Sequence, residues 1–345
     1  MDPGDYYRGG VNRRCVRLLL LGLCLVAFPF RCPAPLVYTP GEGWTYEPVG
    51  GGGKWQRPRA KEQLDVAKAA FEKKDYGLAL KAARRVVKVW PISDSVPEAR
   101  YLMGRCYEAT GRDEKAFKEY QDLLEKQPKL ANFAEVLQRQ YAIADRFLAG
   151  KSFKLWGYIP TGASMSRTAE MYEKIVKTGP YSDVAPQAQM KVGVAHEREK
   201  TFMFKTPDYP GAAKAYEMAA DRYHDRPQVA AEALYRAGSA YHKQAQKAEY
   251  DQSAAGQAIA NFTDFMTLFP NDPRVTQTGN LITALKREQA RGSFQIAKYY
   301  EKSRKWKGAM VYYNEVLQQD PDSPYGAEAR QRIEQLKMRV QTARK

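Results

Sequence analysis

The chain is poor in the residues that usually carry catalysis or hold metals. Its 345 residues include four cysteines and three widely spaced histidines, His196, His224 and His242. So few cysteines exclude a disulfide-framed fold, and the histidine spacing argues against a His-rich metal centre. No GxSxG, P-loop, CxxC or HExxH motif occurs. We therefore expect no enzyme, no catalytic or metal-binding residues and no cofactor.

Long hydrophobic runs are also scarce, and the only one lies near the N-terminus. Four arginines precede an apolar run at residues 18–30, LLLLGLCLVAFPF. A basic region followed by a short apolar run is typical of a secretory signal, which we place at residues 1–34. An uncut membrane anchor is the alternative. Cys24 and Cys32 are candidate lipidation sites, although Leu23 and the charged Arg31 before them are unfavourable. Either way, we expect an exported protein.

Residues 35–60 contain four prolines and the glycine run 50–53. Proline and clustered glycine disfavour a regular helix or a central strand, so we expect a tether with extended and flexible parts. From residue 61 onward, in contrast, the apolar residues follow helical periodicity, and no convincing strand alternation appears.

The helical part repeats one unit of two helices. A small or aromatic residue stands eight positions before a proline that ends the second helix. The pairs are Ala83/Pro91, Tyr120/Pro128, Tyr172/Pro180, Phe262/Pro270 and Tyr313/Pro321. A fourth unit at residues 193–216 loses the pattern after Tyr216. We predict six helical hairpins over about residues 61–321 and a capping helix at about 325–342. An irregular helical bundle is the alternative, but it would not keep this interval.

Between some hairpins a second pattern recurs. Pro91-Ile-Ser93, Pro180-Tyr-Ser182 and Pro321-Asp-Ser323 are each followed by a small residue six positions after the serine. We expect the proline to stop one helix and the serine to cap the next.

The repeat unit resembles the tetratricopeptide repeat. With the pattern between the hairpins, residues 61–345 resemble the BamD family of outer-membrane assembly lipoproteins and, less closely, the periplasmic CpoB family. The resemblance implies an all-α fold, a right-handed superhelix of about six hairpins, whereas the BamD family usually shows five. It implies a scaffold at the inner face of the outer membrane. The expected partners are a BamA-like β-barrel assembly protein and the C-terminal segments of unfolded outer-membrane proteins. A CpoB-like coordinator of cell-wall synthesis and division is the alternative.

Three regions are candidate binding surfaces. The repeat register directs the first set toward a concave groove, where cationic and aromatic side chains suit an extended peptide with a terminal carboxylate. This groove set is Leu64, Lys68, Phe71, Tyr101, Arg105 and Tyr141. The second region is a loop insertion near residues 150–167 with Trp156, Tyr158 and Ile159, which either bind a partner or pack on the neighbouring hairpin.

The third region is basic. The chain carries a formal charge of +16, and residues 286–345 hold fourteen Lys and Arg against seven Asp and Glu. Lys302, Arg304, Lys305 and Lys307 surround Trp306 there. In an exported protein we expect no nucleic-acid partner, so an acidic protein surface or anionic lipid head groups are the candidate targets. A merely solvated basic face is the simpler alternative.

Overall fold

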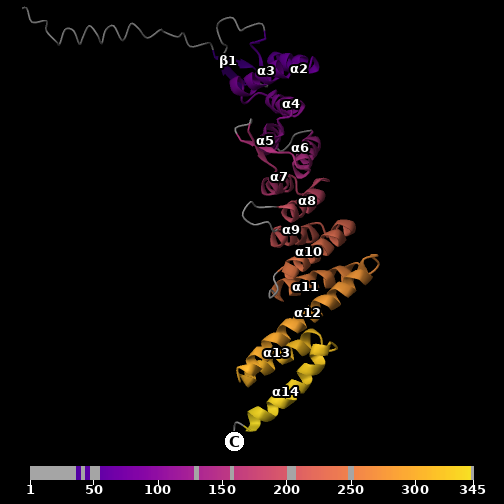
Figure 1. The fold of residues 1–345 in the computed structure, drawn as a ribbon. Coiled ribbons are helices and arrows are strands. Elements are labelled where there is room, and N and C mark those ends of the chain that lie inside the picture. The colour runs from indigo at the N-terminus through magenta and orange to yellow at the C-terminus, as the bar shows by residue number, and fades with distance from the viewer. Residues whose placement is uncertain are drawn as a thin grey trace, which may run out of the picture. The chain divides into compact units, whose positions relative to one another are not determined.

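The computed structural model describes residues 36–39, 43–46, 55–127, 132–155, 159–199, 207–247 and 252–342 (Figure 1). The predicted signal segment, with Cys24 and Cys32, lies outside the described residues, as do Trp156 and Tyr158 of the insertion. The chain divides into two compact units, Met1–Leu102 and Met103–Lys345, with the boundary inside helix α4.

The described residues form thirteen helices and two short β-hairpins. In chain order these elements are β1 (Leu36–Thr39), β2 (Gly43–Tyr46), α2 (Ala60–Glu72), α3 (Tyr76–Val89), α4 (Val96–Ala109), α5 (Asp113–Lys126), α6 (Phe133–Leu148), β3 (Phe153–Leu155), β4 (Ile159–Gly162), α7 (Met165–Thr178), α8 (Ala185–Arg198), α9 (Tyr209–Arg222), α10 (Pro227–Lys247), α11 (Gln252–Leu268), α12 (Val275–Lys302), α13 (Trp306–Gln319) and α14 (Pro324–Thr342).

In the first unit, α2 packs on α3, and an antiparallel hairpin of β1 and β2 precedes them. We expected an extended, flexible tether here, so the strands correct part of that expectation. Aromatic and β-branched residues flank Pro40-Gly41-Glu42 on both sides, which favours a short hairpin despite the prolines. The end of the same segment is held by buried Gln63, whose side chain bonds the backbone of Trp55 and Arg57.

In the second unit, each helix from α5 to α14 packs on the next (Figure 1). With α2–α3 at the N-terminal end, the pairs α4–α5, α6–α7, α8–α9, α10–α11 and α12–α13 make the six predicted hairpins. Helix α14 follows the last pair and contacts both α12 and α13, as expected of a capping helix. The predicted all-α class is confirmed.

In three hairpins the two helices come close because a glycine faces a buried ring. A Cβ added at Gly104, Gly193 or Gly238 would lie 2.2, 2.4 or 2.6 Å from the ring of Tyr120, Tyr216 or Phe262, respectively. These rings are fully buried. In four hairpins the residue eight positions before the closing proline is therefore the buried ring, namely Tyr120, Tyr172, Phe262 and Tyr313.

The buried tyrosines of four hairpins form the same kind of hydrogen bond. Each hydroxyl donates to a carboxylate on the first helix of its own hairpin. The pairs are Tyr120–Glu108 (2.6 Å), Tyr172–Asp145, Tyr216–Glu197 (3.1 Å) and Tyr313–Glu301 (2.7 Å). Burial raises the pKa of Tyr172, Tyr216 and Tyr313, and the nearby carboxylates raise it further. The hydroxyls therefore stay protonated and act as donors.

The serines between hairpins act in two ways. The Ser323 hydroxyl accepts from the Gly326 N–H at 3.1 Å and so caps α14, as predicted. Both serines also donate to the carbonyl three residues back, Ser323 to Asp320 at 2.8 Å and Ser182 to Gly179 at 2.7 Å, but α8 begins after Val184 with no side-chain cap. For Ser182 the predicted cap is therefore wrong: the serine satisfies the end of the preceding helix, whose last carbonyls lack intrahelical partners.

Candidate interaction surfaces

The basic surface predicted near the C-terminus is built on the turn between α12 and α13. The turn closes on backbone bonds alone: Arg304 N–H donates to the Glu301 carbonyl and Lys305 N–H to the Tyr300 carbonyl, both at 2.9 Å. Arg304 adopts a left-handed conformation with φ of 57°. Helix α13 then begins after Lys305 without a side-chain cap. The Lys305 Nζ atom also lies 5.8 Å from the centroid of the Tyr300 ring, a contact that leaves its charge without an acidic partner among the described residues.

The charges of this turn are not neutralised within the part of the chain that the structure describes. Lys302, Arg304, Lys305 and Lys307 are all exposed, and none forms an ion pair with a described residue. The nearest acidic residue in sequence, Glu301, is already engaged by the Tyr313 hydroxyl and by Arg332 at 3.5 Å. The turn therefore presents a concentration of positive charge to solvent.

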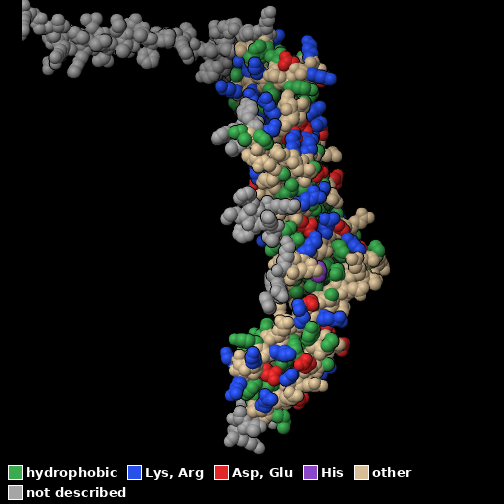
Figure 2. All heavy atoms as spheres, viewed as in Figure 1, with side chains coloured by type: hydrophobic (Ala, Val, Ile, Leu, Met, Phe, Trp, Pro, Cys, Tyr) green, Lys and Arg blue, Asp and Glu red, His purple; other side chains and the backbone are tan. Residues whose placement is uncertain are grey.

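Aromatic rings lie beside these charges. Tyr300 packs on Tyr312, with ring centroids 5.2 Å apart, and faces Gly308. Tyr299 is 68% exposed and meets the edge of Tyr300. Trp306 is half-buried, with the Arg339 guanidinium 5.5 Å from its ring centroid. We call Tyr299, Lys302, Arg304, Lys305, Trp306 and Lys307 the C-terminal surface. Figure 2 shows basic and hydrophobic side chains at the surface of the C-terminal helices.

The sequence analysis missed Tyr299, although a signal was present. Ala297 and Tyr300 face the hairpin interior, and at 100° per residue Tyr299 projects from the other side of the helix. The helical periodicity alone therefore could have predicted that the Tyr299 ring is exposed.

The insertion is a β-hairpin whose base is fixed to the preceding helices. Phe153 is buried and stacks on Phe147, with the two ring centroids 4.3 Å apart. The Arg167 guanidinium also contacts the Phe153 ring, 4.1 Å from its centroid. Glu114 accepts from the Lys154 backbone N–H at 2.6 Å and from Arg167 at 3.3 Å. The base of the insertion therefore packs on the body.

An ion-pair network strengthens that attachment. Asp113 is buried and bonds both Arg146 at 2.7 Å and Lys151 at 2.6 Å. Farther along the hairpin, Ile159 is 51% exposed. The same insertion thus combines a buried base with an exposed residue, and binding by Trp156, Tyr158 and Ile159 stays a prediction.

The six groove residues do not form one exposed set. Leu64 is a core residue, 3% exposed, which corrects its assignment to a groove. In the first unit, Lys68 pairs with Glu98 at 2.6 Å, and Phe71 meets Tyr76 edge to face at 5.5 Å. Tyr101 is half-buried.

In the second unit, Arg105 is half-buried. Tyr141 packs edge to face on Tyr172 at 5.7 Å, and burial, aided by Asp145, raises the pKa of Tyr141 to about 12. Tyr141 therefore fills space between α6 and α7, at the register position where other hairpins carry glycine. Apart from Leu64, the groove assignment stays a prediction.

No described helix has the length and apolarity needed to cross a membrane. Comparison with known families gives two matches. The model of the outer membrane lipoprotein family YfiO matches residues 162–342, more than half of the chain. A tetratricopeptide-repeat model matches residues 64–131. No curated protein matches the chain.

Three of the solved structures similar to the chain are tetratricopeptide-repeat proteins. One from Bacteroides fragilis is 14% identical, with a TM-score of 0.34, covering 81% of this chain and 98% of that one. The C-terminal part of one from Cytophaga hutchinsonii is 15% identical, with a TM-score of 0.32, covering 79% and 87%. One from Parabacteroides merdae is 10% identical, with a TM-score of 0.30, covering 81% and 98%. The repeat model and the helix order confirm the predicted tetratricopeptide-repeat fold.

Proposed function

The chain belongs to the YfiO family of outer membrane lipoproteins, and on that premise we propose that it is a non-enzymatic scaffold of outer-membrane β-barrel assembly. The two family matches support a tetratricopeptide-repeat scaffold protein of the cell envelope. In our proposal the chain is exported and held at the inner face of the outer membrane. Cys24 or Cys32 carries the lipid.

The observation that carries the proposal is the C-terminal surface, which lies within the family-matched residues. Its basic side chains are free of internal ion pairs with described residues, and Tyr299 stands exposed beside them. Exposed rings supply contact area at low entropic cost, and unpaired charges speed encounter with a surface of opposite sign. We assign this surface to a BamA-like partner whose contacting face is acidic.

A second part of the proposal concerns the client. Lys68, Phe71 and Tyr101, all in the first unit, bind the C-terminal segment of an unfolded barrel protein. Cationic groups suit its terminal carboxylate and the rings suit its aromatic side chains. The scaffold positions this segment and makes or breaks no covalent bond. Deleting the terminal segment from a client should abolish binding, and unchanged binding would refute this part.

Affinity purification from detergent-solubilised envelopes, followed by mass spectrometry, tests the partner assignment. A C-terminally tagged chain should recover a BamA-like barrel protein in near-equal amount. Recovery of cell-wall enzymes or division proteins in its place would favour the CpoB-like coordinator and contradict the proposal. The mature N-terminus gives a second readout, because an acylated cysteine is expected for the assembly role.

Charge reversal then tests the surface itself. In one variant, Lys302, Arg304 and Lys307 are changed to Glu. Reversal of exposed charges at about 0.5–1 kcal/mol each should weaken partner binding by about tenfold or more.

The matched control changes Lys174, Lys214 and Lys286 to Glu. These three lysines are exposed on α7, α9 and α12 and form no ion pair with a described residue, so the net charge changes equally. An equal loss of partner binding in both variants would show a general effect of charge. It would refute the assignment of the C-terminal surface to the partner. Loss of binding to anionic vesicles alone, with partner recovery intact, would assign the surface to lipid.

A further inference from the structure

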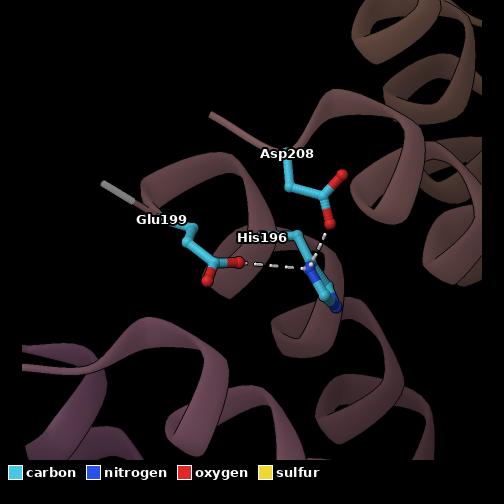
Figure 3. Close-up of side chains that lie close together, drawn as sticks. All are labelled: His196, Glu199 and Asp208. Atoms are coloured by element: carbon cyan, nitrogen blue, oxygen red, sulfur yellow. Dashed lines mark ion pairs between the residues drawn. The ribbon is translucent and has the colours of Figure 1, made fainter. Parts of the chain in front are cut away.

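Three potential metal ligands from the α8–α9 connection face one another. His196 lies in the last turn of α8, Glu199 follows the end of that helix, and Asp208 precedes α9. The His196 Nδ1 atom is 2.9 Å from the Asp208 Oδ2 atom and 3.7 Å from the Glu199 Oε2 atom. All three ligand atoms lie within 4.8 Å of one another. Figure 3 shows both carboxylates directed at the same ring nitrogen.

Local backbone bonds, rather than side-chain attraction, bring the groups together. The His196 carbonyl accepts from the backbone N–H groups of both Glu199 and Asp208, each at 3.2 Å. The Asp208 Oδ1 atom caps α9 by accepting from the Gly211 N–H at 3.0 Å. The other oxygen of Asp208, Oδ2, is thereby turned toward the imidazole. The cluster is pre-positioned by elements that the fold needs anyway.

The imidazole nitrogen at the centre of the cluster is buried but makes no hydrogen bond to a described residue. The Asp208 oxygen is near enough for such a bond, so its direction from the ring must be unsuitable. Buried polar atoms without a partner are uncommon and often mark an ion site. Gly211 lets both side chains approach this point, because a Cβ there would lie 2.1 Å from Asp208 Oδ2 and 3.0 Å from His196 Nδ1.

The charge of the cluster supports the same conclusion. The whole chain has 55 lysines and arginines, yet neither Glu199 nor Asp208 pairs with one among the described residues. The two carboxylates together bring two negative charges to the cluster. A divalent cation would balance that charge.

We propose that His196, Glu199 and Asp208 form a binding site for a first-row divalent transition metal ion, with Zn²⁺ as the representative. An imidazole nitrogen with two carboxylate oxygens suits Zn²⁺, whereas Ca²⁺ and Mg²⁺ prefer oxygen ligands alone. Water completes the coordination. The ion ties the end of α8 to the start of α9, so it stabilises this connection and takes no part in covalent chemistry.

Isothermal titration of the tag-free full-length chain with Zn²⁺ tests the site. We expect one saturable site per chain, weaker binding of Ca²⁺, and a Zn²⁺-dependent rise in Tm that a chelator reverses. His196→Gln, Glu199→Gln and Asp208→Asn should each weaken Zn²⁺ binding by about tenfold or more, because even supporting groups around a metal contribute that much. Asparagine retains the helix-capping oxygen, so Asp208→Asn preserves the fold.

His224→Gln is the matched control, because His224 is exposed and bonds only its own turn. This variant should bind Zn²⁺ as the parent does. Cys106 does not compete for the metal, since it is buried and burial raises the pKa of its thiol to about 11. Absence of saturable Zn²⁺ binding would overturn the proposal and leave an ion pair only. Zn²⁺ binding that survives in all three ligand variants would overturn it equally.

Discussion

The packing of a ring against a glycine predicts that one added methyl group will destabilise the repeat. In Gly193→Ala, the new Cβ would lie 2.4 Å from Cε1 of Tyr216 and 2.6 Å from its Cζ. Ordinary carbon contacts begin about 1 Å farther away. The ring cannot yield freely, because it is fully buried and its hydroxyl donates to Glu197 at 3.1 Å.

Two effects of opposite sign determine the size of the change. Overpacking a well-filled interior costs about 1–3 kcal/mol. Replacing a helical glycine by alanine returns up to about 1 kcal/mol of helix propensity. The matched control is Gly279→Ala, another helical glycine, whose Cβ would meet only the Met266 Cε atom at 3.7 Å. The control gains the propensity without the clash, so the two variants should differ by about 1–3 kcal/mol in the free energy of unfolding.

Urea denaturation followed by circular dichroism measures that difference. Equal slopes with a lower midpoint for Gly193→Ala than for Gly279→Ala would support the close approach of α8 and α9. Equal midpoints would refute the reasoning, because the methyl group would then find room beside Tyr216.

Three further predictions concern single contacts. Arg274 holds the pKa of Asp272 at about 2, below its ordinary 3.8, so this pair stabilises the fold above about pH 4 and loses that contribution as the pH falls toward 2. Asp272→Asn should therefore cost about 1 kcal/mol at neutral pH and nothing near pH 2 in thermal melts, since the pair is partly solvated. Arg167→Ala removes the guanidinium from the Phe153 ring and should speed proteolysis of the insertion, whereas an unchanged rate would contradict its anchoring role. Tyr313→Phe should cost about 1 kcal/mol of stability by urea titration, and no loss would show that its bond to Glu301 contributes nothing.

The helices and their pairing could be predicted from the sequence because their signals are local. Proline ends a helix wherever it stands, and small and aromatic residues at helical spacing mark the face that a neighbouring helix covers. The position eight residues before the proline is occupied by the buried ring in α5, α7, α11 and α13. Tyr216 takes the same place in α9 although no proline follows it at that interval.

What the sequence could not supply are contacts set by residues far apart in the chain. Tyr141 was assigned to a groove because its register resembles that of exposed positions. In the structure it packs edge to face on Tyr172, at the position that glycine holds in three other hairpins. In the same way, the approach of Asp208 to His196 depends on how the chain returns after α8, and spacing alone does not determine that return.

The short strands of the insertion were also not predicted from the sequence. β3 and β4 carry only a few residues, too few for alternation to be detected against the helical background. Their place is determined by Phe153 packing on Phe147, a tertiary contact.

Site-specific photo-crosslinking at Tyr299 in living cells tests the central claim most directly. A photoreactive residue there should crosslink to a BamA-like barrel protein. Tyr181 is the matched control, since it is 96% exposed on a turn before α8, outside the C-terminal surface. The account predicts the BamA-like adduct at position 299 and not at 181. No such adduct at 299, or equal adducts at both positions, would contradict it.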